Sequence, residues 1–567
     1  MRGITQFGSL AEALTDEVLS WDPVYSTQLG WRKYDGLLGD PSDDGFSRQI
    51  GRMKSLITDL KTIPDTELSP DEDLDRDLAI HIFENRVFEL EELKLHIHMS
   101  VGPGKLADGL FFLFVRENMP LEVRFDAITA RLERAPEFLD KARRAVTDPY
   151  PVWNSTALDT GEGLLHFIDL VVATAEARLG SCARTTKLKA AAKKAVDAVT
   201  QHNEWLRQTL AGDKRACHGV ERGCFEKLLA LRGFGVNSDE AFRIAEMQLI
   251  TAKRLRDEVA RRISPGGGLP EAMRIMREDH PQSFEEAMKA YRESIGKARE
   301  FVIQKKLVMV PDGEKLLVME TPHFMRKYAP FAAQFEPARF ANDMTGLFLV
   351  TPDGGDPAAL MEHNFPIITN TSVHEAYPGH HLQGVCAVTN PSMIRALCGS
   401  ADFAEGWALY CEDLMISEGY NATDMGRLAQ LNDLIFRIVR VIAEVKLSRG
   451  EMTVEQAAEM LHAETGMDMR PAMDEARSYT HSPTYYMAYY IGKLAIMQLR
   501  EDAERALKDR FSLEFFHTSL VTAGCMPMIF MRRALALRIA EKYGADLGPQ
   551  RESLSQFATR MSSKGRV

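Results

Sequence analysis

Apolar residues recur at helical spacing over most of this chain, and no other feature of the sequence constrains the fold as strongly. Between Arg184 and Leu210, leucine, valine and alanine return every three, four or seven residues, as on one face of an amphipathic helix. Another helix is expected to begin at Asn237, because Glu240 follows it at capping-box spacing. Strand-like runs are scarce, and the best are Lys315 to Met319 and Gly346 to Val350. We therefore predict an all-α, mainly helical fold with a very small β element.

The 567 residues are enough to build a large core. Loops rich in proline and glycine interrupt the helices, but we find no long flexible tether and no repeat of fixed period. We predict two helical lobes around a deep central cleft, with residues 1–310 in the N-terminal lobe and 311–567 in the C-terminal lobe. The two could also form one continuous catalytic domain. A helical scaffold without catalysis is the alternative, and it accounts for everything up to residue 370.

The charge of the chain excludes several classes of partner. A formal net charge of -12 and a pI near 5.8 argue against nucleic acid, because phosphate binding needs a basic surface. No run of about 18 apolar residues predicts a membrane span, and the amino terminus does not resemble a secretion signal. The seven cysteines are scattered without a CxxC pair, which is typical of reduced thiols. We therefore expect a cytoplasmic protein.

Residues 371–383 hold the side chains most suited to chemistry. In zinc peptidases with two histidines one helical turn apart, both imidazoles bind the metal, and the glutamate between them takes a proton from the metal-bound water. Here Glu375, directly after His374, stands where that general base is needed. The position four after His374 is Pro378, however, and on a straight helix His380 would lie about 120° away from the face of His374.

A break in the helix would resolve this mismatch. Pro378 lacks a backbone donor and Gly379 tolerates unusual backbone angles, so two extra residues can be absorbed there and His380 brought to the place of the second ligand. His381 returns nearly to the face of His374, but it stands about 10.5 Å further along a straight helix. We predict His374 and His380 as metal ligands, with His381 as the alternative second ligand.

A carboxylate further along the chain can complete this site. Glu405 lies in the apolar, helix-forming segment 403–414, 25 residues after His380. Three protein ligands leave the fourth position of a catalytic zinc open for water, so we predict one Zn²⁺ per chain. Glu412, two turns beyond Glu405 on the same helical face, is suited to hold a ligating imidazole from behind.

A third cluster contains tyrosines and a histidine. Tyr486 and Tyr490 are one helical turn apart, and His481 precedes their helix. Phenol and imidazole donors of this kind can stabilise the oxyanion of a tetrahedral intermediate, although such groups are also common in packing.

Together these blocks resemble a known bacterial family. Residues 374–383 match the pattern His-Glu-x-x-Pro-Gly-His-His-x-Gln of domain of unknown function 885 throughout, and the resemblance extends over most of the chain. That family is in turn similar to helical zinc peptidases such as thimet oligopeptidase, neurolysin and angiotensin-converting enzyme. This second resemblance implies an almost wholly helical, two-lobed protein with a deep cleft.

The same resemblance implies roles for individual residues. It assigns the third metal ligand to Glu405. It makes His481, Tyr486 and Tyr490 the oxyanion donors, with Tyr485 and Tyr489 as alternatives one residue out of register. Residues 346–350 would form the strand that holds an extended substrate at the edge of the cleft.

The function that follows is that of a zinc metallopeptidase acting on short peptides, of the oligopeptidase or carboxypeptidase type. A metal-dependent hydrolase of a non-peptide amide, or a non-catalytic helical binding protein stabilised by a metal, are the alternatives. Five cations near the later blocks are candidates to bind a substrate carboxylate, and nothing in the sequence selects among them: Arg477, Lys493, Arg500, Arg532 and Arg533.

Overall fold

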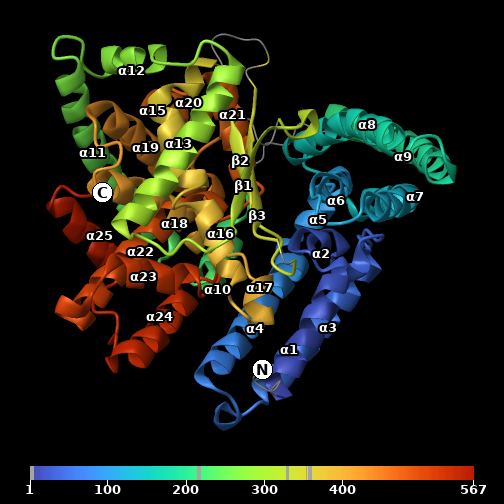
Figure 1. Ribbon diagram of the computed structural model, residues 1–567, viewed down its shortest axis with the longest axis horizontal. Coiled ribbons are helices and arrows are strands. Elements are labelled where there is room, and N and C mark those ends of the chain that lie inside the picture. The colour runs from blue at the N-terminus through green and yellow to red at the C-terminus, as the bar shows by residue number, and fades with distance from the viewer. Residues whose placement is uncertain (1–5, 213–218, 327–330, 342, 353, 355–359) are drawn as a thin grey trace.

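The computed structural model describes residues 6–212, 219–326, 331–341, 343–352, 354 and 360–567 (Figure 1). It is 74% helical and contains a single small sheet within the described residues, which confirms the predicted mainly helical fold. The helices before the sheet are α1 (Gln6–Trp21), α2 (Pro23–Leu29), α3 (Asp43–Lys61), α4 (Pro70–Phe88), α5 (Leu95–His98), α6 (Gly102–Val115), α7 (Leu121–Ala145), α8 (Pro151–Leu179), α9 (Ala183–Gly212), α10 (Arg222–Arg232), α11 (Ser238–Ile263), α12 (Gly268–Glu278) and α13 (Phe284–Lys305).

The helices after the sheet carry the residues predicted for chemistry. They are α15 (Phe365–Glu375), α16 (His380–Val388), α17 (Met393–Leu397), α18 (Ala401–Ser417), α19 (Asp424–Ser448), α20 (Val454–Thr465), α21 (Met469–Tyr479), α22 (Tyr485–Leu507), α23 (Leu513–Val521), α24 (Met528–Tyr543) and α25 (Leu554–Ser563). Helix α9 matches the helix predicted from residue 184 to 210. Helix α11 begins as predicted, with Asn237 and Glu240 exchanging both bonds of a capping box.

The sheet has the strand order β1-β3-β2, with β1 (Lys315–Glu320), β2 (Ala332–Phe335) and β3 (Thr345–Val350). Strand β3 pairs in parallel with β1 and antiparallel with β2. Both predicted strands are therefore present, whereas β2 was not predicted. Because β3 is the central strand, its backbone already bonds to two neighbours and cannot hold an extended substrate. That role, expected for residues 346–350, is open only to the edge strands β1 and β2.

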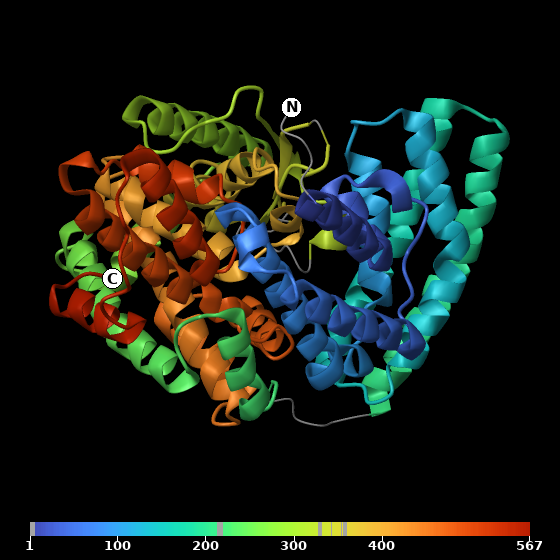
Figure 2. The same ribbon diagram turned by 90° about the horizontal axis from the view of Figure 1, so that it is seen from below.

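Hydrophobic clusters show how the helices are grouped. Helices α6 to α9 supply most of one cluster, which also includes Val24 of α2 and Leu349 of β3, and they extend to the side of the molecule as an arm (Figures 1 and 2). A second cluster joins α11 with α19, α20, α22 and α25. The largest joins α1, α3 and α4 to α13, α15, α16, α18 and α24, and it includes Val302 and Val308 as well as Phe348. The predicted boundary at residue 310 therefore falls inside a shared core.

A cavity of about 630 Å³ lies where the arm meets the sheet. Phe125 and Ile128 of α7 line it on one side, and Leu317 and Met319 of β1 line it on the other. None of the predicted metal ligands belongs to its wall. The deep central cleft expected between two lobes thus stays a prediction.

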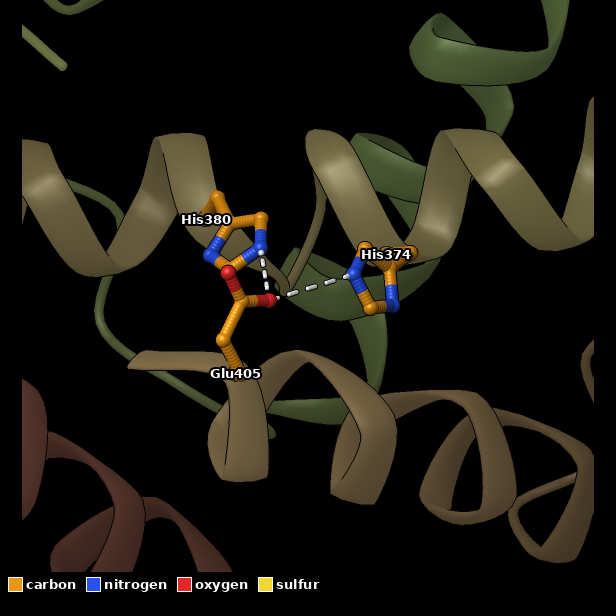
Figure 3. A group of neighbouring side chains, drawn as sticks. All are labelled: His374, His380 and Glu405. Carbon is orange, nitrogen blue, oxygen red and sulfur yellow. Dashed lines mark ion pairs between the residues drawn. The ribbon is translucent and has the colours of Figure 1, made fainter. Parts of the chain in front are cut away.

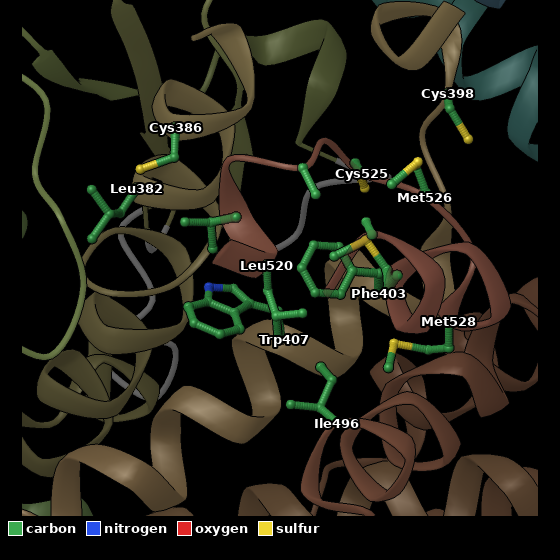
Figure 4. Packing of buried hydrophobic residues seen from close by; sticks show 14 of the residues in the cluster. Leu382, Cys386, Cys398, Phe403, Trp407, Ile496, Leu520, Cys525, Met526 and Met528 are labelled. Carbon is green, nitrogen blue, oxygen red and sulfur yellow. The ribbon is translucent and has the colours of Figure 1, made fainter. Parts of the chain in front are cut away.

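Helix α18 is buried at the centre of the larger body. Figure 4 shows Phe403 and Trp407 of this helix packed among Leu382, Ile496 and Leu520, and both aromatic side chains are fully buried. Burying side chains of this size stabilises the fold by roughly 2 to 3 kcal/mol each. On the face toward α22 the two backbones touch, because a Cβ atom on Gly406 would lie 2.5 Å from the carbonyl carbon of Gly492. Helix α18 is therefore held firmly in place.

Two further expectations concern the whole chain. No helix among the described residues has the length and apolar character needed to cross a membrane. The six cysteines in the described part of the chain are free thiols, and Cys217 lies outside the described residues.

Candidate metal centre

The helix that carries the predicted ligands is broken between Glu375 and His380, at the proline and glycine. The Gly379 N–H donates to the Val373 carbonyl at 3.1 Å, and the Leu382 N–H donates to the Ala376 carbonyl at 3.2 Å. Each bond spans six residues, whereas a regular α-helix bond spans four. The break thus absorbs two residues, which is the number that separates His380 from an ordinary i+4 ligand.

Neighbouring groups fix the shape of this break. The fully buried Trp407 of α18 donates its indole N–H to the Pro378 carbonyl at 2.9 Å, and the Tyr377–Pro378 peptide bond is cis. A Cβ atom at position 379 would lie 1.8 Å from the carbonyl oxygen of His374, so only glycine fits there. The sequence pattern Pro-Gly therefore has a steric cause.

The break lets His374, His380 and Glu405 converge (Figure 3). One nitrogen or oxygen atom from each residue lies within 4.8 Å of the other two. Glu405 Oε2 is 3.2 Å from His380 Nε2 and 3.8 Å from His374 Nε2. The two imidazole rings are nearly perpendicular, and α18 presents the carboxylate between them.

A buried hydrogen-bond network orients His374. Its Nδ1 donates to Glu412 Oε1 at 2.7 Å, and the Glu412 side chain is completely buried. Asn370 donates to the other oxygen of Glu412 and also to Asp433. With the proton on Nδ1, the lone pair of Nε2 faces Glu405, which is the tautomer that a metal ligand needs. Glu412 thus occupies the supporting position expected from the sequence.

Glu405 has one satisfied oxygen and one that lacks a donor. Its Oε1 accepts a hydrogen bond from the Tyr485 hydroxyl at 2.6 Å, whereas the buried Oε2 has no hydrogen-bond partner among the described residues. Two imidazoles and a carboxylate bound to zinc at about 2.0 to 2.2 Å would be separated by roughly 3.3 Å, close to the 3.2 and 3.8 Å seen here. The residues present therefore fit a zinc ion.

The electrostatics of the three residues are strongly coupled. Burial opposes a charge on His374, but the neighbouring carboxylates of Glu405 and Glu412 outweigh it and raise the pKa of this imidazole to about 10. Burial also opposes a charge on Glu405, yet the two imidazoles hold the pKa of this carboxyl well below its usual range. The pocket consequently favours a negative carboxylate facing positive charge, whether from protons or from a cation.

Glu375 is the last residue of α15 and is half-buried. Its charge contributes to raising the pKa of both His374 and His380, so its carboxylate lies near both rings. Among the described residues it has no hydrogen-bond or ion-pair partner. A carboxylate beside the ligands with free lone pairs is suited to accept a proton.

The tyrosines that reach the centre are not the predicted pair. Tyr485 bonds to Glu405, and its hydroxyl lies 3.4 Å from that of Tyr489, whose ring is stacked 6.3 Å from the ring of His374. Tyr490 is fully buried in the core, and Tyr486 packs against Tyr479. The pair one residue out of register is the one that faces the site.

His481 is also placed away from the centre. Its ring packs against Trp153 of α8, and its described hydrogen bond is with Ser482. Burial lowers the pKa of this histidine to about 4. None of its described contacts involves Glu405 or the two ligand histidines.

His381 belongs to a different cluster. Its Nε2 lies 2.9 Å from Glu314 Oε2, and both side chains are buried. Tyr377 donates to the same oxygen, and Arg299 donates to the other at 2.7 Å. Burial raises the pKa of Glu314, but these three donors outweigh it and lower the pKa to about 2. The structure therefore points His380, and not His381, toward Glu405.

The family of the chain can be given now that the site is described. A family model described as "Bacterial protein of unknown function (DUF885)" matches residues 23–535. The chain belongs to this family. No curated protein matches it. The family description states no activity, so membership alone assigns none to the centre.

Two solved structures have the same fold as this DUF885 chain. One, from Shewanella oneidensis, is described as a "putative lipoprotein of unknown function"; it is 22% identical, with a TM-score of 0.76 over 93% of this chain and 99% of that one. The other, described as the "putative lipoprotein from Colwellia psychrerythraea", is 17% identical, with a TM-score of 0.80 over 95% of this chain and 100% of that one.

These identities support the fold alone. Neither description names a peptidase, so the resemblance to helical zinc peptidases stays a prediction. The descriptions also give no support to the predicted cytoplasmic location.

Sequence reasoning missed several residues near the centre. Asp433, Arg437 and Arg440 of α19 lie beside Asn370 and Tyr489. The available signal was a polar stripe at i, i+4 and i+7 in an otherwise apolar helix.

The five candidate cations contact other groups, namely Asp474 for Arg477, Asp413 for Lys493, Glu504 for Arg500, Asp502 for Arg532, and Asp73 and Asp77 for Arg533.

Proposed function

We propose that this protein is a zinc-dependent peptidase that hydrolyses short peptides, with one Zn²⁺ held by His374, His380 and Glu405. The observation that carries the proposal is the convergence of these three side chains on one point, with a buried Glu405 oxygen that lacks a hydrogen-bond donor. Bound zinc would activate a water molecule and polarise the scissile carbonyl.

The neighbouring residues would handle the proton. Glu375 accepts it from the attacking water at its free carboxylate and later returns it to the nitrogen of the leaving amine. This nearby carboxylate favours catalysis over a purely structural metal site, which needs no base. Tyr489 is the better oxyanion donor, because the Tyr485 hydroxyl already donates to Glu405. His481, Tyr486 and Tyr490 have no role in this scheme, since none of their described contacts reaches the ligands.

The test combines metal analysis with a cleavage assay. We expect about one zinc per chain in the wild type and in Glu375→Gln, and we expect peptide cleavage in the variant to fall by roughly a hundredfold or more. Glu293→Gln, which changes an exposed carboxylate on α13, is the matched control and should behave as the wild type. Wild-type protein without zinc would refute the proposal, and full activity of Glu375→Gln would remove this residue as the base.

A zinc-loaded wild type that leaves a broad peptide mixture intact would shift the proposal to another amide substrate. The place of action is a separate question. The two solved relatives are described as lipoproteins, so a location outside the cytoplasm is the alternative to the predicted one. Fractionation of native cells, followed by immunodetection of this chain, distinguishes the two locations.

A further inference from the structure

Two arginines of α19 lie near Tyr489, whose ring is stacked near the ligand His374 of the candidate metal centre. The guanidinium carbon of Arg440 is 4.7 Å from the centre of the Tyr489 ring, and that of Arg437 is 6.0 Å from it. The Tyr489 ring is nearly parallel to the ring of His374, at 6.3 Å between centroids. A cation is thus positioned close to the point where the proposed chemistry occurs.

The two arginines differ in how fully they are used. Arg440 is more buried, and its Nη2 donates to both oxygens of Glu475 at 3.1 and 3.2 Å. Its guanidinium also packs on Phe436. Arg440 therefore has a carboxylate partner already.

Arg437 is different, because its one described hydrogen bond goes to a carbonyl of its own helix and none goes to a side chain. Its Nη1 donates to the Asp433 carbonyl at 3.3 Å and lies 3.4 Å from the Asp433 carboxylate, while its buried Nε, like that of Arg440, has no acceptor. Its Nη2 has no described contact. An arginine carries five N–H donors, and because Nε is buried and Nη1 contacts Asp433, the two donors of Nη2 are the ones left for a ligand. Asp433 does not contact Arg437 alone, because its other carboxylate oxygen accepts a hydrogen bond from Asn370 at 2.7 Å.

We propose that Arg437 binds the C-terminal carboxylate of the peptide substrate, an inference that rests on the proposed peptidase function. The planar guanidinium matches a carboxylate in a two-point contact, and the rings of Phe436 and Tyr489, with centres 5.1 and 6.0 Å from its carbon, restrict its orientation. The substrate class is then peptides with a free C-terminus, and the enzyme is of the carboxypeptidase type.

The distances limit how many residues the enzyme can remove from the C-terminus of a peptide. The guanidinium carbon of Arg437 cannot be further from the His374 ring than 6.0 and 6.3 Å taken together. An extended peptide covers about 3.3 to 3.6 Å per residue, so one or two residues fit between the scissile bond and the anchored carboxylate. Hydrolysis adds water across that peptide bond, and the products are a shortened peptide and a free amino acid or dipeptide.

The experiment compares one peptide with a free C-terminal carboxylate and the same peptide with a C-terminal amide. We expect the zinc-loaded wild type to cleave the acid with a kcat/KM about tenfold to a hundredfold higher than that for the amide. Mass spectrometry should show release of the last one or two residues. Arg437→Gln should lose this preference, mainly through a higher KM for the acid, with zinc content unchanged. Arg437→Lys should recover part of it, because lysine keeps the charge without the planar fork. Arg477→Gln, on neighbouring α21, is the control and should keep the preference.

Each remaining outcome has a definite meaning. Equal kcat/KM for acid and amide in the wild type overturns the anchor while leaving the peptidase function intact. A preference that survives in Arg437→Gln, or internal cleavage far from the C-terminus, overturns it as well. If zinc-loaded wild type cleaves neither peptide nor a broad peptide mixture, the proposed function fails and the anchor fails with it.

Discussion

His380 and His381 are neighbours in the chain, yet they lie in two different clusters. The clusters contain similar residues, but they differ in how many hydrogen-bond donors surround the buried carboxylate. His381 faces Glu314, which also accepts hydrogen bonds from Tyr377 and Arg299. His380 faces Glu405, whose Oε2 lies 3.2 Å from it and has no hydrogen-bond partner among the described residues. Both carboxylates are buried beside imidazoles, but the donors are sufficient only around Glu314.

This difference shows how a structural histidine can be told from a metal ligand when both are buried. A buried carboxylate surrounded by donors is satisfied and gains little from an ion. A buried carboxylate oxygen that lacks a hydrogen-bond donor is not, and a cation beside it completes the site. The number of available donors therefore separates the two clusters better than residue type does.

The largest expected effect comes from removing one histidine at a time. His380→Ala should weaken zinc binding on the order of a hundredfold or more, because one of three protein ligands is lost. His381→Ala should keep zinc affinity within a few-fold of the wild type, because His381 contacts Glu314 and not the centre. Competition with chelators of graded strength measures the zinc affinity of both variants. The opposite pattern would move the metal to the Glu314 cluster and reverse the comparison.

A second, smaller effect concerns acid stability, and it belongs to the Glu314 cluster. The pKa of Glu314 is about 2 in the folded protein, below the value of about 4.3 in an unfolded chain. The stabilisation is therefore present above about pH 4.3 and is lost as the pH falls toward 2. Between pH 6 and pH 3, the wild type should lose about 2 kcal/mol more unfolding free energy than Glu314→Gln.

Urea unfolding at the two pH values measures this difference. Glu293→Gln, which changes an exposed carboxylate, is the control and should follow the wild type. Parallel pH dependence of the wild type and Glu314→Gln would show that the cluster does not hold Glu314 ionised.

The smallest expected effect tests the support behind His374. Glu412→Gln keeps the size of the side chain and one acceptor oxygen but removes the charge, so zinc affinity should fall about tenfold. Glu418→Gln, at the C-terminal end of the same helix, should leave the affinity unchanged. Zinc titration of both variants measures these affinities. Equal affinity in Glu412→Gln and wild type would mean that the hydrogen bond between Glu412 and His374 does not strengthen zinc binding.

Local features of the fold could be predicted from the sequence. Apolar spacing of three and four residues gives α9 within two residues at each end, and the capping box gives the start of α11, because a helix depends on near neighbours. The break before His380 follows from the same local chemistry, since proline and glycine act on their own backbone. The spacing to Glu405 indicated a following helix, and the structure places that helix, α18, beside α15 and α16.

Other features depend on tertiary packing and could not be read from spacing. Tyr485 with Tyr489 and Tyr486 with Tyr490 are separated by the same four residues, so only the rotation of α22 against α18 decides which pair faces Glu405. Strand order is likewise non-local, which is why the substrate-holding role was assigned to β3, although β3 is the central strand. Glu314 is separated from His381 by 67 residues, and no pattern in the chain links the two.

The contact between Gly406 and Gly492 has a consequence for motion. At this crossing no side chain separates the backbones of α18 and α22, so the two helices cannot move closer there without a backbone collision. Glu405 on one helix and the tyrosine pair on the other must therefore travel as a single rigid wall. A movement that admits a substrate is therefore expected from elements other than α18 and α22.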